Sequence, residues 1–95
     1  MRITIIAVGK VKEKFYRDAI AEFEKRLSKY CKLDIIEVAD EKTPDNASEA
    51  QELIIKSKEG DRILSAVKDD MYVIALAIEG KQLSSTELAD KINKL

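Results

Sequence analysis

The sequence predicts an α/β domain built on a parallel sheet, with its elements in the order β-α-β-α-β-α. Three short runs have the β-branched and apolar composition of strands: residues 2–8, 33–38 and 71–78. The stretches after each run repeat apolar residues every three or four positions, as amphipathic helices do. Strands that alternate with helices imply a parallel sheet with right-handed crossovers. With 95 residues, the chain is expected to be a single α/β domain, 1–95, or a fragment of one.

The first strand, residues 2–8 (RITIIAV), stops at Gly9. The helix predicted after it covers residues 11–30. Its apolar stripe consists of Phe15, Tyr16, Ala19, Ile20, Phe23, Leu27 and Tyr30. We interpret Tyr16 and Tyr30 as packing residues of this stripe rather than as platforms for stacking bases.

The second strand, residues 33–38 (LDIIEV), leads into a loop at 39–46 that contains the only proline, Pro44. Two capping patterns fit the start of the next helix, Asn46 with Glu49 or Ser48 with Gln51. That helix is expected to bury Ala50, Leu53, Ile54, Ile63, Leu64 and Val67. Gly60 lies inside it and costs about 1 kcal/mol relative to alanine, so we expect a bend or break there.

The third strand, residues 71–78 (MYVIALAI), has eight apolar residues without alternation, which is typical of a strand covered on both faces. Ser84 and Glu87 form a capping box that opens a last helix reaching Lys94.

In a three-stranded sheet, the orders 2-1-3 and 1-3-2 each leave one strongly apolar strand at an edge. The order 2-1-3 leaves the third strand at an edge, where an apolar strand tends to aggregate. The order 1-3-2 covers it but exposes the equally apolar first strand. We therefore expect the chain to be incomplete, or to find its missing neighbours in another subunit.

Composition excludes several classes of site. The chain has no histidine and a single cysteine, Cys31, so it lacks the residues for an intramolecular disulfide, a zinc site or a Ser-His or Cys-His pair. The lone thiol indicates a reducing, cytoplasmic compartment. No apolar run approaches the roughly 20 residues that cross a bilayer, so no membrane partner is expected. Because histidine and a second cysteine are missing, no metal partner is expected either.

Positive charge is concentrated at the start of the first helix, although the net charge of the chain is only −1. Lys10, Lys12, Lys14 and Arg17 are accompanied there by a single acid, Glu13. A solvated helix start is the simpler interpretation, and a phosphate-facing patch is the alternative.

The carboxyl ends of the strands are where open parallel sheets bind ligands, but the residues there form no self-contained active site. Gly9-Lys10 lacks the spacing of a phosphate loop and is interpreted as a turn. Asp40 and Glu41 could bind a hard cation, but adjacent carboxylates on a polar loop usually face water, which is the interpretation favoured here. Ser84 and Ser85 are interpreted as capping residues, because no base lies near them in sequence to activate a hydroxyl.

Three segments of the sequence resemble the RlmH family of SPOUT-class methyltransferases in order and spacing. They are "MRITIIAVGKVKEKFYRDAIAEFEKRLSKYCKLDIIEVADEK", "KEGDRIL" and "IALAIEGKQLSSTELADKI". The resemblance covers essentially all 95 residues and corresponds to the N-terminal part of the family, without its C-terminal trefoil knot. It implies a Rossmann-like N-terminal part of a SPOUT fold, and a homodimer in the intact protein.

The resemblance also implies an activity and a cofactor. The family transfers a methyl group from S-adenosyl-L-methionine to N3 of a pseudouridine in large-subunit ribosomal RNA, within the ribosome or its large subunit. The family's adenosyl-lining leucine matches Leu76, which makes Leu76 the one expected cofactor-binding residue. Many relatives carry an acidic residue directly after it, where this chain has Ala77. No catalytic residue and no metal ligand carries over, and the 95-residue chain alone is expected to be inactive.

A non-enzymatic role remains the alternative hypothesis. The same α/β segment could act as an oligomerisation or ribosome-docking module, through its open sheet edge and the basic residues from Lys10 to Arg17. A small nucleotide or phosphate binder is a weaker third possibility, because the phosphate-loop spacing is missing.

Overall fold

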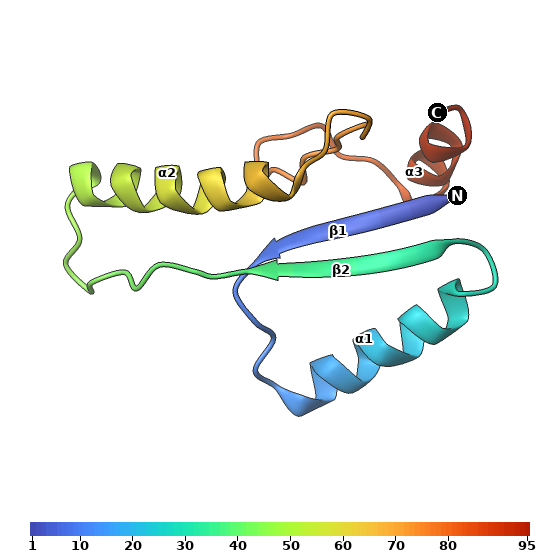
Figure 1. The fold of residues 1–95 in the computed structure, drawn as a ribbon, viewed down its shortest axis with the longest axis horizontal. Helices are drawn as coiled ribbons and strands as arrows, with labels where there is room; N and C mark the ends of the chain where they lie inside the picture. The colour runs from blue at the N-terminus through green and yellow to red at the C-terminus, as the bar shows by residue number, and fades with distance from the viewer.

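The computed structural model describes all residues, 1–95. Its elements are β1 (Arg2–Val8), α1 (Lys14–Leu27), β2 (Lys32–Val38), α2 (Glu49–Ala66) and α3 (Ser85–Asn93). Figure 1 shows the two strands side by side at the centre, with α1 and α2 on opposite sides of them and α3 close to the N-terminus. The α/β class is confirmed, whereas the full β-α-β-α-β-α order is not formed.

The two strands pair in parallel, as predicted. Their register runs from Arg2 opposite Lys32 to Val8 opposite Val38. Direct pairing of β1 with β2 rules out the order 1-3-2, in which another strand would lie between them. The second edge of β1 therefore carries no partner strand.

The predicted third strand is wrong for this structure, because residues 71–77 adopt no regular structure. The backbone hydrogen bonds at the two ends of the segment are local: Met71 N–H donates to the Lys68 carbonyl (3.1 Å) and Gly80 N–H to that of Ala77 (3.0 Å). The apolar composition of the segment is that of a strand covered on both faces. This chain supplies no such cover, so the segment remains irregular, and residues 72–77 are exposed.

Helices α2 and α3 begin where local capping chemistry predicts. Of the two patterns at the start of α2, the structure forms the one at Ser48: its hydroxyl accepts from Gln51 N–H (3.2 Å), and the Gln51 side chain accepts from Ser48 N–H (2.9 Å). The expected bend or break at Gly60 is wrong, since α2 runs through it without interruption. The helix predicted over 11–30 is shorter, with its regular part at Lys14–Leu27.

No residue of the chain is fully buried, so the predicted interior of α2 is also wrong. Leu53, Ile54 and Leu64 are each more than half exposed. The accessible surface is 8691 Å², against about 5,500 Å² for a compact monomer of this mass. The radius of gyration is 15.7 Å, where about 12 Å is typical of this length. The helices therefore present apolar stripes that the chain itself does not cover.

No helix of the chain combines the length and the apolar composition that a bilayer crossing requires.

Candidate functional site

The carboxyl ends of β1 and β2 meet at one edge of the sheet, where the two arrowheads lie together in Figure 1. Gly9 N–H continues the pairing beyond the strands by donating to the Val38 carbonyl (2.8 Å). Gly9 has a φ of +88°, a conformation that side-chain-bearing residues rarely adopt. The glycine therefore allows the chain to leave β1 at this edge and turn towards α1, as the sequence predicted.

Side chains of α2 bind the loop that follows β2 through hydrogen bonds and an ion pair. The Arg62 guanidinium donates from Nη1 to the Ala39 carbonyl (2.9 Å) and pairs through Nη2 with the Glu41 carboxylate. Glu59 accepts a hydrogen bond from Glu41 N–H at 3.0 Å. Sequence reasoning gave no role to Glu59 or Arg62. Their spacing of three places them on one helix face. The acidic loop at 39–46 needs a counter-charge, and this was the one signal in the sequence that could have indicated a role for Arg62.

The adjacent carboxylates of Asp40 and Glu41 do not form a cation site. Glu41 is part-buried and pairs with Arg62, so the expectation that it faces water is wrong for this residue. The Asp40 side chain lies beside Gly9, with its Cβ and Cγ 3.9 Å from where a Cβ of residue 9 would stand. The structure contains no group of three or more Cys, Asp or Glu side chains placed to hold a metal ion.

Leu76, the expected cofactor-binding residue, lies in the irregular segment at 71–77, with 93% of its surface exposed. Ile78, two residues further along, is fully exposed. An adenosyl group needs apolar cover on more than one side. Leu76 lines neither of the two main hollows of the molecule. The residues present therefore do not by themselves form a pocket for S-adenosylmethionine.

Ser84 is the N-cap of α3, as predicted. Its hydroxyl accepts from Glu87 N–H (3.2 Å), and the Glu87 carboxylate accepts from Ser84 N–H (3.1 Å). The hydrogen bond from the Ser84 backbone, followed by that from its side chain, lowers the pKa of Glu87 below its ordinary value of 4.5. These bonds give both side chains a structural role at the start of α3.

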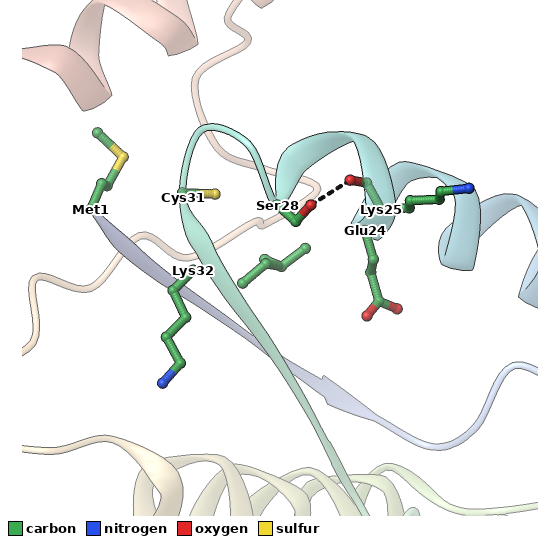
Figure 2. Close-up of a pocket in the computed structure, with 7 residues that line it drawn as sticks. Met1, Glu24, Lys25, Ser28, Cys31 and Lys32 are labelled. Atoms are coloured by element: carbon green, nitrogen blue, oxygen red, sulfur yellow. Dashed lines mark hydrogen bonds between the residues drawn. The ribbon is translucent and has the colours of Figure 1, made fainter.

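A first open hollow, of about 790 Å³, lies at the amino ends of the strands. It is lined by Met1, Glu24, Lys25, Ser28, Cys31, Lys32 and Leu33. Figure 2 shows these residues around the turn from α1 into β2, where the Ser28 hydroxyl donates to the Lys25 carbonyl (2.6 Å). This hollow is at the opposite end of the sheet from the edge where open parallel sheets bind ligands.

A second hollow, of about 510 Å³, lies beside the start of β1 and is mainly apolar. Met71, Tyr72 and Ile74 line it together with the first residues of β1, and Ile92 and Leu95 close it at the end of the chain. The segment predicted as the third strand thus lies next to β1 without pairing with it.

Comparison with known proteins supplies what the geometry alone does not. A family model described as "Predicted SPOUT methyltransferase" matches residues 1–95. Ribosomal RNA large subunit methyltransferase H of Bifidobacterium adolescentis is 66% identical over 95 residues. The proteins of the same name from Clostridium novyi and Clostridium beijerinckii are 64% and 62% identical. Each alignment covers 100% of this chain and 60% of the relative, so the chain spans about 60% of the length of these relatives.

Proposed function

The chain belongs to the SPOUT methyltransferase family, and on that basis we propose that its intact protein is a methyltransferase of large-subunit ribosomal RNA. The single observation that supports this most strongly is similarity along all 95 residues to proteins of that name. The proposed target atom is N3 of a pseudouridine, which follows from the resemblance to the RlmH family. The present chain alone is proposed to be inactive.

Isotope transfer tests this function directly. The chain, extended by the C-terminal part of the Bifidobacterium adolescentis relative, is incubated with methyl-labelled S-adenosylmethionine and with ribosomes that lack the modification. We expect label in large-subunit RNA, at a pseudouridine. Absence of label from the RNA, with ribosomes that another large-subunit methyltransferase does modify, would refute the proposal.

S-adenosylmethionine is the proposed methyl donor, with Leu76 as an apolar contact to its adenosyl group. The high exposure of Leu76 is consistent with a residue that becomes covered only when more of the protein is present. The rest of that pocket is assigned to residues outside this chain, and none of the 95 residues is given a catalytic role.

A homodimer is proposed for the intact protein, and the cytoplasm for its compartment. The first is supported by an accessible surface that exceeds that of a compact monomer by about 3,000 Å², much of it on apolar side chains. The second follows from a ribosomal substrate and a lone, unpaired Cys31.

A non-enzymatic oligomerisation or ribosome-docking module is the second candidate. The free edge of β1 and the open Leu76 segment favour it, because neither provides an enclosed site. Sedimentation of this chain separates the two candidates. A single well-defined oligomer supports a free-standing module, whereas an unstable or aggregating chain supports a part of an enzyme.

A further inference from the structure

The start of α1 carries positive charge that nothing in the structure neutralises. Four basic side chains form what we term the basic patch: Lys10, Lys12, Lys14 and Arg17. All four are exposed, and none belongs to any of the ion pairs in the structure. With Glu13 as the one acid among them, residues 10–17 have a charge of +3, which leaves −4 on the remainder of a chain whose total is −1.

These charges do not stabilise the helix that carries them. The first turn of α1 contains no acidic residue, and Glu13 at its N-cap makes no side-chain capping bond. Lys14 and Arg17 instead place positive charge at the positive end of the helix dipole, which is unfavourable. The solvated helix start favoured by the sequence alone therefore leaves the choice of charges unexplained.

An aromatic pair lies within the basic patch. It includes Tyr16, which the sequence predicted to be a packing residue but which is more than half exposed in the structure. The rings of Phe15 and Tyr16 are 4.2 Å apart between centroids and tilted by 40°, and the two residues are 63% and 55% exposed. Basic side chains interleaved with exposed rings match the chemistry of single-stranded RNA, because the cations neutralise phosphates and the rings stack on unpaired bases.

The basic patch is also at the end of the sheet where a substrate is expected. Lys10 directly follows Gly9 at the carboxyl edge of β1, and Figure 1 shows the connection to α1 leaving from the arrowhead of that strand. The nearby acid Glu41 has its charge matched by Arg62. The unpaired acids at this edge are Asp40, beside Gly9, and Glu37, which lies opposite Ala7 near the end of β2.

We propose that the basic patch and the Phe15–Tyr16 ring pair form a docking surface for a single-stranded stretch of RNA. The choice of RNA as the partner rests on the proposed function, and the assignment of this surface goes beyond it. The basic side chains hold the phosphates, and the ring pair stacks on a base.

The test compares two variants that lose the same charge. In one, each residue of the basic patch is replaced by glutamine. In the control, glutamine replaces four exposed lysines elsewhere: Lys29, Lys56, Lys58 and Lys91. Both are made in the 95-residue chain and in the chain extended by the C-terminal part of the Bifidobacterium adolescentis relative. Circular dichroism checks that helix content is retained.

The measurement is the affinity for a fluorescein-labelled, unstructured oligouridylate over a series of salt concentrations, without any methyl donor. Four phosphate contacts correspond to a slope of about −3 in log affinity against log salt, or roughly 50-fold over a fourfold rise in salt. The patch variant is expected to lose that dependence and the control to keep it. Equal losses in the two variants would overturn the proposal.

The ring pair has its own control. Tyr16→Leu keeps an apolar side chain in the helix but removes the stacking surface, so affinity for oligouridylate should fall about tenfold. Tyr30, in the turn after α1, is 80% exposed, and Tyr30→Leu should leave the affinity unchanged. An equal effect of the two substitutions would refute stacking at Tyr16.

Methyl transfer by the extended protein is measured in parallel, so that failure of the docking surface can be distinguished from failure of the proposed function. Normal labelling of ribosomal RNA with equal RNA affinity in both charge variants overturns the docking surface and leaves the function standing. Loss of binding specific to the patch variant supports the docking surface, even if no preparation methylates RNA.

Discussion

Arg62 of α2 binds the chain just beyond β2 at two points, the Ala39 carbonyl through Nη1 and the Glu41 carboxylate through Nη2. Arg62 and Glu41 are 21 residues apart in the sequence. No residue of the chain is buried, so polar contacts matter for holding α2 in place. This two-point contact of Arg62, which we call the Arg62 fork, joins α2 to the carboxyl edge together with the hydrogen bond from Glu41 N–H to Glu59. The planar guanidinium suits the task, since it presents several donors in a fixed geometry.

Replacing Arg62 should therefore destabilise the chain. We expect Arg62→Ala to lower the free energy of unfolding by about 1–2 kcal/mol, a value reduced because the Arg62 and Glu41 side chains are 37% and 26% exposed. Arg62→Lys should recover little of this, because an ammonium lacks the fork. Urea denaturation followed by circular dichroism measures both. Arg26→Ala is the control: its pair with Glu22 is largely exposed and should contribute under about 1 kcal/mol. Similar losses for Arg62→Ala and Arg26→Ala would contradict a special role of the fork.

Two glycines should respond to alanine in opposite directions. Gly9→Ala forces a side chain into a φ of +88° and should cost about 1–2 kcal/mol of unfolding free energy. The new Cβ meets Asp40 only at an ordinary 3.9 Å, so the cost is one of backbone conformation. Gly60→Ala places a methyl in open space inside α2 and should stabilise by about 0.5–1 kcal/mol. Denaturation midpoints that move in the same direction would show this account of the backbone to be wrong.

The elements that were predicted correctly from the sequence are those that local chemistry determines. β1 was predicted to the residue because a β-branched run ends at a glycine, and the start of α3 was predicted because Ser84 and Glu87 are three residues apart. These features are decided within a few positions of the chain.

The failures at the 71–78 segment and in the interior of α2 depend on contacts distant in sequence. The 71–78 segment has strand composition, but a strand forms only with a paired edge and covered faces, and these cannot be read from the segment itself. The apolar positions of α2 were recognised, yet Leu53 and Leu64 remain exposed because nothing in the chain packs on them. At the candidate site, Leu76 came from family resemblance, and the Arg62 fork joins residues that no local pattern connects.

The N-terminus of α3 should weaken in acid. Because the folded-state pKa of Glu87 is lowered, its contribution to stability is fully present above about pH 4.5 and is lost as the pH falls through the folded-state pKa. Helix content measured by circular dichroism should decline over that range. Glu87→Gln keeps a side chain that can accept from Ser84 N–H but does not titrate. The acid-induced loss should therefore be smaller in this variant, and identical profiles would refute the role of Glu87.

Leu76 should affect cofactor binding without affecting the stability of this chain. Because it is 93% exposed, Leu76→Ala should change the unfolding free energy of the 95-residue chain by less than about 0.5 kcal/mol. In the chain extended to the length of its relatives, the same substitution removes apolar contact worth about 2 kcal/mol, so S-adenosylmethionine should bind roughly 30-fold more weakly.

Calorimetric titration of S-adenosylmethionine into both lengths of chain tests this assignment. Val73→Ala is the matched control, because Val73 lies in the same segment and is also largely exposed (62%). Binding by the extended chain alone, weakened by Leu76→Ala and not by Val73→Ala, means that Leu76 is one wall of a pocket completed by residues outside this chain. Tight binding by the 95-residue chain would mean that the cofactor pocket does not need those residues and is formed within residues 1–95.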